Sequence, residues 1–442
     1  MLASGGPDTA QGMAFLSRNF VLLWQGQLVS QLGNQAFFIA SAYFVLDATG
    51  SSTVVAGVMM ASTLPLVLIG PFGGVVADRW PRRSILIVTD ALRGAAMGAL
   101  ALLILRGTDP SHHVEAVIAV ALINGVLAAL FTPAFQAIIP DVIDIERLPL
   151  ANSITQFSTH ATILAGQAAG GLVYVWWGAG ALFLVDALSF AYAAVLTSWI
   201  VIRRPVAPAP VAVGSALRAV VAQVRDGVAY LRSRAALRSI LLVFLAVNLL
   251  FTPVFALLPL YVRDVLGRGP EWYGWLLAAS GLGALAGATL AAPVVSRTRA
   301  TLALAATCVV VIGGGVLTLA LAWSVWLSAA AFIAIGAASS LINVAIVTAF
   351  QSAAPTALRG RVMSLVVAVS AAAVPVGLGL GGVLGDVWRD SLRLVVGACG
   401  ALTLALGAAA AALPSAQTSF DVPDDAESVS SPTGPAPGAD AG

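Results

Sequence analysis

Long apolar stretches alternate with short polar or Arg-containing segments along most of the chain. A helix that crosses a lipid bilayer needs about 20 mostly apolar residues, and twelve stretches reach that length. We therefore predict an all-α membrane protein with twelve transmembrane helices. Their approximate ranges are 20–46, 53–77, 84–105, 114–136, 151–175, 179–202, 239–262, 272–295, 300–322, 325–350, 361–386 and 391–413.

The composition also favours a membrane location. Of the 442 residues, 59% are hydrophobic and 10% are charged, whereas an average soluble domain has about 25% charged residues. Such a chain would expose most of its apolar surface in water, so an ordinary soluble enzyme is excluded. Cys308 and Cys399 lie within apolar stretches and lack metal-ligand spacing, so we expect packing residues and no disulfide framework, metal site or cofactor.

The 22 basic residues are all Arg, and their distribution predicts the orientation in the membrane. With an even number of spans and a cytoplasmic N-terminus, 16 Arg fall on the cytoplasmic side, five fall outside and Arg93 lies within a span. This bias follows the positive-inside rule, so we expect both termini in the cytoplasm. Residues 1–19 are predicted to form a cytoplasmic tail, and residues 414–442 have the composition of a disordered one.

The longest connection, residues 203–238, divides the spans into two sets of six. Arg218, Arg225 and Arg232 recur every seven residues, which predicts a basic amphipathic helix that contacts lipids at the cytoplasmic surface. A plain solvated linker helix is the alternative. The two six-helix halves cover residues 20–202 and 239–413.

The two halves also resemble each other. A shift of 217 residues aligns one Asp and three Gly, and the pattern A-F-Q-x-x-x-P recurs at an offset of 215. We infer an internal duplication, with an axis along the membrane normal and a binding site between the halves near the midplane. The aligned residues are Asp47, Gly50, Gly57 and Gly70 with Asp264, Gly267, Gly274 and Gly287.

A short charged turn, G-V-V-A-D-R-W-P-R-R at residues 74–83, joins the second and third spans. Its carboxylate and guanidinium groups can pair with each other or with a facing helix end, and can separate when the halves move. We therefore predict a gating latch. Simple positive-inside anchoring would explain the Arg residues but not Asp78.

This turn resembles the G-x-x-x-D-R-x-G-R-R signature of the major facilitator superfamily, although Pro81 replaces the usual Gly. The opening F-V-L-L-W-Q-G-Q, the run D-A-T-G-S-S and the D-x-x-R pattern look like the drug:proton antiporter branch that includes macrolide exporters and the enterobactin exporter. The resemblance implies a monomer of the bacterial inner membrane, built as two six-helix repeats, that carries a small molecule and protons. The matched signature residues are Gly74, Asp78, Arg79, Arg82 and Arg83.

The resemblance further implies that the first, fourth, seventh and tenth spans line a central cavity, and each of them carries an amide near its middle. A buried amide without a partner is costly, so these side chains should face one another or a wet cavity. Hydrogen bonding between helices is their alternative role. Nine aromatic residues could form an apolar wall between these amides that would suit bulky lipophilic ligands, with packing between helices as their alternative role: Trp24, Phe37, Phe38, Tyr43, Phe131, Phe135, Phe244, Phe251 and Phe255. The amide residues are Gln31, Asn34, Asn124, Asn248 and Asn343.

Proton coupling needs a titratable group, and ionisable residues inside a membrane are functional candidates. Asp90 and Arg93, three residues apart, can share a helical face, so we expect an ion pair. His160 in the fifth span can bind and release a proton near neutral pH, with a packing histidine as the alternative. Asp186 in the sixth span is expected to be protonated or bonded to Ser189 or another neighbour.

We therefore expect a secondary active transporter that exports hydrophobic or amphipathic compounds, such as drugs, macrolides or siderophore-like metabolites, in exchange for protons. The alternatives are a proton-coupled importer, a dedicated metabolite exporter and a transport-dead sensor. The ATP-binding pattern G-x-x-x-x-G-K-[ST] is impossible in a chain without Lys. Neither an enzymatic activity nor a nucleic-acid partner is expected.

Overall fold

The computed structural model describes residues 17–107, 113–202, 225, 228–232, 234–297, 301–354 and 356–413. These ranges are almost entirely helical and contain no strand. Each predicted span falls on a helix. Most of the predicted linker helix, including Arg218, and almost all of both tails lie outside the described residues.

Two sets of long helices follow one another along the chain, separated by the linker region. The first set is α2 (Arg18–Thr49), α3 (Ser52–Arg79), α4 (Arg82–Leu105), α5 (Val114–Val142) and α6 (Leu148–Ser198). The second set is α8 (Ala235–Leu260), α9 (Pro270–Arg297), α10 (Thr301–Leu321), α11 (Val325–Ala353), α12 (Thr356–Val387) and α13 (Leu392–Ala411). The short helices between them are η2 (Ile145–Arg147), η3 (Tyr261–Val265) and η4 (Arg389–Ser391).

Helix α6 is interrupted near its middle. Its 51 residues would extend about 77 Å as one straight helix, far more than the roughly 30 Å of a bilayer core. Gly178 has φ 73° and ψ 178°, a conformation outside the helical region that glycine adopts without a Cβ clash. The predicted spans 151–175 and 179–202 therefore lie on the two sides of this break.

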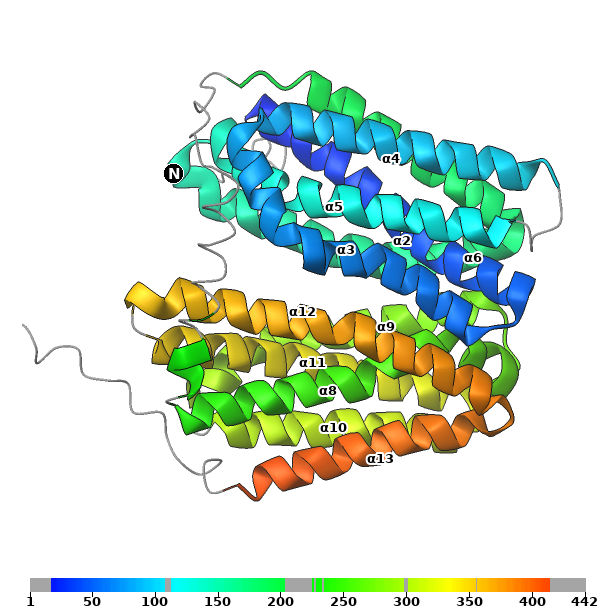
Figure 1. The fold of residues 1–442 in the computed structure, drawn as a ribbon, viewed down its shortest axis with the longest axis vertical. Coiled ribbons are helices and arrows are strands. Elements are labelled where there is room, and N and C mark those ends of the chain that lie inside the picture. Colours follow the sequence, from blue (N-terminus) through cyan, green and yellow to red (C-terminus); the bar gives the residue numbers. More distant parts are fainter. Residues whose placement is uncertain are drawn as a thin grey trace, which may run out of the picture.

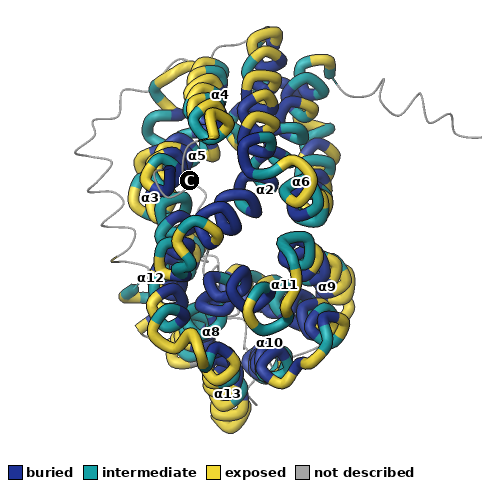
Figure 2. The backbone as a smooth tube through the Cα atoms, turned by 90° about the vertical axis from the view of Figure 1, so that its right-hand side faces the viewer, coloured by how far each residue is buried: buried dark blue, intermediate teal, exposed yellow. Residues whose placement is uncertain are grey.

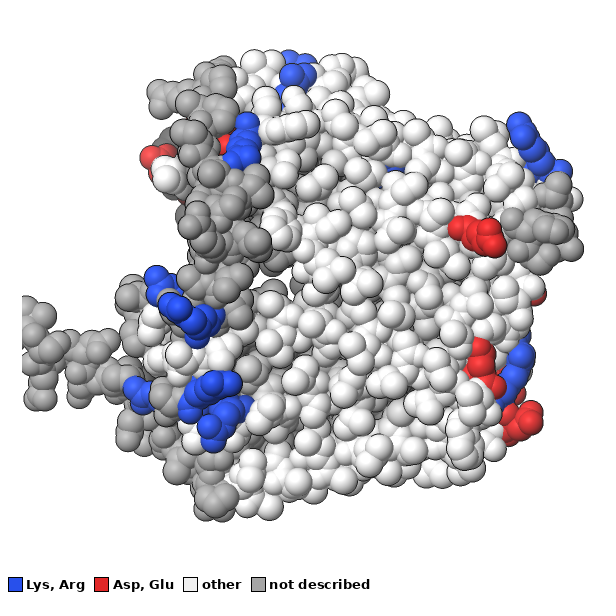
Figure 3. Space-filling view, viewed as in Figure 1, with Lys and Arg blue, Asp and Glu red and all other residues white. Residues whose placement is uncertain are grey.

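The described residues include ten helical segments that are long and apolar enough to cross a membrane, so the chain is a multi-pass membrane protein. The segment 145–198 counts once in that number, and α2, in which Gln and Asn recur, is not one of the ten. Large side chains such as Trp176 and Leu394 remain 69% exposed, as a lipid-facing surface requires. Charged side chains gather at the two ends of the face in Figure 3.

The helices pack as two groups, α2 to α6 and α8 to α13 (Figure 1). In the first group α2 packs on α6, α3 on α5 and α4 on α6, and in the second α8 packs on α12, α9 on α11 and α10 on α13. The groups meet mainly where α3 contacts α12 and where α6 contacts α9 (Figure 2). One buried apolar cluster lies within each group and a third spans both.

Candidate functional site

A central cavity of about 860 Å³ lies between the two helix groups. Its walls come from α2, α3 and α6 of the first group and from α8 to α12 of the second. This volume falls in the range that drug-sized ligands occupy in proteins. Both groups therefore contribute to one site large enough for a small molecule.

The lining of this cavity combines aromatic rings with uncharged polar groups. Four Phe side chains line it, and Phe251 and Phe255 form a T-shaped pair with centroids 5.0 Å apart. No Asp, Glu or Arg lies among its described lining residues, so it suits a lipophilic ligand that offers a few hydrogen-bonding groups. The polar lining residues are Thr63, Gln156, His160, Asn248, Thr252, Ser280, Ser339, Ser340 and Asn343.

The structure separates the amides that the sequence singled out. Asn248 and Asn343 line the central cavity, although the Nδ2 group of Asn248 also donates a hydrogen bond of 2.8 Å to the Phe244 carbonyl of its own helix. Gln31 instead accepts a 3.1 Å hydrogen bond from the Thr162 hydroxyl of α6, which matches the helix-bridging alternative. His160 is exposed to the central cavity.

A second, smaller cavity of about 250 Å³ lies inside the first helix group. Asn34 of α2, Arg93 of α4 and Asn124 of α5 line it, together with Phe38 and Met59, which also line the central cavity. The side-chain nitrogen and oxygen of Asn124 are both buried without a hydrogen-bond partner. This cavity is therefore a small space next to the central one, with a few polar side chains in a mostly apolar wall.

The expected ion pair between Asp90 and Arg93 is not formed. Neither carboxylate oxygen of Asp90 accepts a hydrogen bond, and the Arg93 guanidinium lies 5.1 Å from the ring centroid of Phe131 and 5.5 Å from that of Phe190. Rings on α5 and α6 hold the guanidinium through cation–π contacts, so the spacing along α4 alone does not set its position.

Asp186 follows the prediction more closely. The Ser189 hydroxyl lies 3.3 Å from its Oδ1 atom as a hydrogen-bond donor, while its Oδ2 atom has no partner. Asp186 is fully buried, and a Cβ placed on Gly33 of α2 would collide with this carboxylate and with the Ser189 hydroxyl. A side chain at position 33 would therefore force the Asp186 and Ser189 side chains to move.

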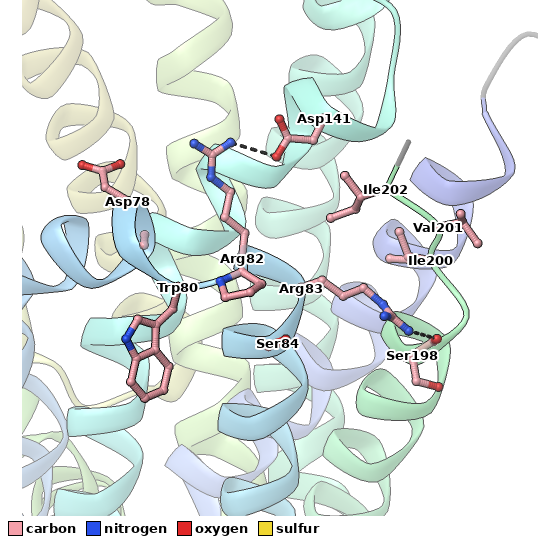
Figure 4. Close-up of a pocket in the computed structure, with 12 residues that line it drawn as sticks. Asp78, Trp80, Arg82, Arg83, Ser84, Asp141, Ser198, Ile200, Val201 and Ile202 are labelled. Atoms are coloured by element: carbon pink, nitrogen blue, oxygen red, sulfur yellow. Dashed lines mark hydrogen bonds and ion pairs between the residues drawn. The ribbon is translucent and has the colours of Figure 1, made fainter. Parts of the chain in front are cut away.

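The charged turn at residues 74–83 ends α3 and begins α4, and it lines a pocket of about 460 Å³ (Figure 4). An Arg82 nitrogen donates to the Asp141 carboxylate at 2.8 Å. Arg83 donates to the carbonyls of Thr197 and Ser198 at the end of α6, where the helix dipole favours a cation. Both Arg therefore connect elements within the first helix group.

Asp78 and Arg79 are the two charged members of the turn that have no hydrogen-bond or ion-pair partner among the described residues. The Asp78 side chain is exposed and makes no hydrogen bond or ion pair within the described part of the chain, and in Figure 4 it lies apart from the Arg82–Asp141 pair. Arg79 likewise makes no hydrogen bond or ion pair with a described residue. Gly74 has open space around its Cα, so close packing does not require glycine there.

The two groups are joined at the opposite end of the helices. Asp386, near the end of α12, accepts hydrogen bonds from the backbone N–H of Ser52 at 2.7 Å and of Thr53 at 3.0 Å, which are the first residues of α3. The Ser52 hydroxyl also donates to Asp386 at 2.9 Å. A carboxylate from one group thus caps the start of a helix in the other, a favourable position for a negative charge.

Arg389 of η4 makes a second contact between the two groups, in which a positive charge lies at the end of a helix. Its guanidinium donates a 2.8 Å hydrogen bond to the Gly50 carbonyl, which follows the end of α2. The buried rings of Tyr43 and Tyr273 close the same end, with centroids 5.5 Å apart. All hydrogen bonds between the two groups within the described ranges lie at this end of the bundle.

Sequence reasoning missed this closure. Ser51 and Ser52 have the residue types of a helix N-cap, a signal that identifies the start of α3 but not its partner 334 residues away. It also missed Gln156, a polar residue of the cavity that lies one helical turn before His160.

Comparison with known proteins agrees with this architecture. Residues 11–433 match the family described as transmembrane secretion effector, which falls within the major facilitator superfamily. The chain belongs to this family. The fold and family of this major facilitator protein are those of membrane transporters and not of enzymes.

Two curated relatives of this major facilitator protein are efflux proteins. Macrolide efflux protein A from Streptococcus pyogenes is 26% identical over 255 residues, which cover 57% of this chain and 60% of that relative. The multidrug efflux pump Tap from Mycolicibacterium fortuitum is 28% identical over 378 residues, which cover 83% of this chain and 89% of that relative. The first match thus spans about three fifths of the relative's length.

Solved structures share the fold. A bacterial homologue of the iron transporter ferroportin in its inward-facing state superposes with a TM-score of 0.67 at 17% identity, over 90% of this chain and 99% of that one. The outward-facing state of a bacterial ferroportin homologue gives a TM-score of 0.53 at 17% identity, over 89% and 99% of the two chains.

Proposed function

We propose that this protein is a secondary active transporter of the bacterial inner membrane that exports hydrophobic or amphipathic small molecules in exchange for protons. The observation that carries the proposal is the central cavity, which both helix groups line with Phe rings and uncharged polar groups and which lies beside one closed end. The efflux relatives support the direction of transport. The cavity lies within one chain, which supports a working monomer.

The transporter has twelve spans in two six-helix repeats. Helix α2 supplies the first span because its 32 residues extend about 48 Å, and the break at Gly178 makes two spans of α6. The packing pairs support the duplication, since α3 on α5 corresponds to α9 on α11 and α4 on α6 corresponds to α10 on α13. The two contacts between the groups, α3 with α12 and α9 with α6, also exchange under the 217-residue shift.

We assign the structure to the inward-facing state of an alternating-access cycle. The Asp78 end lies on the cytoplasmic side because Arg is concentrated there, and both termini lie on that side. The helix groups are joined at the other end, through Asp386 and Arg389. The higher TM-score with the inward-facing ferroportin homologue is consistent with this state.

The substrate binds between Asn248 and Asn343 of the second group and His160 of the first, against the four Phe rings. Asn34 and Asn124 serve the adjoining small cavity, and Gln31 holds α2 against α6. The amides supply hydrogen bonds and the rings supply apolar contact, so ligands with both kinds of surface are favoured.

The charged turn acts as the inner latch. Gly74, Arg79, Arg82 and Arg83 belong to it, and Arg82 and Arg83 fix the end of α3 to α5 and α6. Asp78 has no hydrogen-bond or ion-pair partner among the described residues in this state, and it pairs across the groups when the cytoplasmic end closes.

Accumulation of a panel of fluorescent lipophilic compounds in a pump-deficient bacterium tests this function. Cells that express the protein should retain less of at least one compound, and a proton ionophore should abolish the difference. A variant with both Asn248→Leu and Asn343→Leu, present in the membrane at the same amount, is the control that separates transport from expression. Higher accumulation than in control cells would favour import, and no change across the panel would favour a dedicated metabolite exporter or a transport-dead sensor.

A further inference from the structure

Three charged side chains are buried together inside the first helix group. Asp90 and Arg93 lie on α4 and Asp186 lies on α6, and their exposed fractions are 0%, 6% and 0%. The positive charge of Arg93 interacts electrostatically with both carboxylates. Their burial places them away from the charged turn and from the lining of the central cavity.

Among the described residues, no other charged group shares this interior. Helix α4 packs mainly on α5 and α6, and α6 also packs on α2 and α9. The remaining charged residues of these five helices lie near helix ends. Helix α6 also carries His160, but that imidazole faces the central cavity. The remaining charged residues are Arg18 and Asp47 on α2, Arg82 and Arg83 on α4, Glu115 and Asp141 on α5, and Glu271 and Arg297 on α9.

The three groups make fewer hydrogen bonds than buried charges normally do, and Ser189 donates the only one, to Oδ1 of Asp186, among the described residues. Both oxygens of Asp90 and the Oδ2 atom of Asp186 are buried without a partner, and Arg93 makes no hydrogen bond with any described residue. The guanidinium lies over the rings of Phe131 and Phe190. The cluster therefore holds two carboxyl groups and one guanidinium with several free donor and acceptor positions.

The net charge of the cluster depends on how many protons its two carboxyl groups hold. If all three groups were ionised, the interior would hold one uncompensated negative charge, which is strongly unfavourable away from water. If both carboxyl groups were protonated, one positive charge would remain. A single proton makes the cluster neutral, because one carboxylate then balances Arg93.

We propose that Asp90, Arg93 and Asp186 bind one exchangeable proton, which the two carboxyl groups share. The proton forms an O–H bond with one carboxylate oxygen when the site is loaded and passes to a water molecule when the site empties. This proposal rests on the proposed proton-coupled function and assigns its proton to this cluster rather than to His160.

The small cavity provides a path for the proton. Arg93 lines this space of about 250 Å³ with Asn34 and Asn124, which is enough room for several water molecules. Phe38 and Met59 line both this cavity and the central one, so they form the boundary between the two spaces. A ligand pressed against Phe38 and Met59 closes the path, and its departure opens it.

Helix α2 connects the proton site to movement of the helix groups. Gly33 lies directly against the Asp186 carboxylate, and Asn34 and Phe38 of the same helix line the cavities. A displacement of α2 therefore changes both the surroundings of Asp186 and the boundary at Phe38.

Infrared difference spectroscopy of the purified full-length protein, without substrate, tests the site directly. As the pH is raised, the wild-type protein should lose the C=O band of one buried protonated carboxyl group. Asp90→Asn and Asp186→Asn should each abolish this loss, because Arg93 and the remaining carboxylate are already neutral together. Glu115→Gln, which removes an exposed carboxylate on α5, should leave the band unchanged.

A further variant gives a signal in the opposite direction. Arg93→Gln leaves two buried carboxyl groups without a cation, so both should be protonated and the band should roughly double. This result remains measurable if an Asn variant fails to fold. Persistence of the titrating band in either single Asn variant, or an unchanged band in Arg93→Gln, overturns the shared proton.

The experiment also separates this inference from the proposed function. The infrared titration needs neither a substrate nor transport, so failure of the export assay leaves its outcome intact. If export is observed and Asp186→Asn still binds substrate, its transport should no longer respond to a pH gradient. Pump activity with unchanged proton dependence in that variant would overturn the assignment and retain the exporter.

Discussion

The carboxylate of Asp386 should set how often the outer end of the transporter opens. In the inward-facing state it accepts hydrogen bonds from two backbone N–H groups at the start of α3, and these bonds must break when the outer end opens. A hydrogen bond to a charged group contributes about 1.5–3 kcal/mol, and a carboxylate at a helix N-terminus about 0.3–1 kcal/mol. Because Asp386 is partly exposed, we take the lower part of these ranges, about 1.5 kcal/mol for the charge.

Asp386→Asn removes the charge and keeps the size of the side chain. An effect of about 1.5 kcal/mol should raise the ratio of outward-open to inward-open molecules roughly tenfold. Single-molecule fluorescence transfer between dyes at Arg106→Cys and Trp323→Cys, two exposed positions beyond α4 and α10, measures that ratio. Both native cysteines are buried, so they interfere little with labelling.

Asp390→Asn provides the matched control. Asp390 is exposed, lies four residues further on and makes no hydrogen bond with a described residue, so its substitution changes the same charge without touching α3. The ratio should stay at the wild-type value in this control. An unchanged ratio in Asp386→Asn, or an equal shift in both variants, would refute the reasoning that the cap stabilises the closed outer end.

Three further outcomes follow from the same contacts. Asp78→Asn should lower the transport rate without lowering the amount of protein in the membrane, since Asp78 has no partner in the inward-facing state; a normal rate would remove the latch. Asn343→Leu should raise the KM for an exported compound about tenfold through loss of one hydrogen bond, and equal kinetics would show that the substrate lies elsewhere. Gly33→Ala should destabilise the protein by about 1–3 kcal/mol, measured as a lower unfolding temperature in detergent, whereas Gly57→Ala, which has open space at its Cβ position, should not.

The hydrophobic pattern predicts the helices because membrane spans depend on composition and length. Even the break at Gly178 is visible in the sequence, as the short gap between two apolar stretches. The sequence was less informative about which amides line a cavity. Asn34 and Gln31 lie three residues apart on α2, yet one lines the small cavity and the other bonds to Thr162.

Side-chain partners that come from distant helices could not be predicted. The spacing of Asp90 and Arg93 favoured an ion pair, but Phe131 and Phe190 on two other helices hold the guanidinium. These contacts depend on how the helices are packed, which hydropathy does not specify.

Transport by the purified protein in proteoliposomes tests the central claim most directly. The vesicles would contain a fluorescent amphipathic compound selected in the cell assay, and a pH gradient would be imposed across their membrane. The account predicts movement of the compound against its concentration gradient, with protons moving the opposite way, and loss of both fluxes in the Asn248→Leu, Asn343→Leu double variant. Movement that ignores the pH gradient, or that persists in the double variant, would contradict proton-driven export through the central cavity.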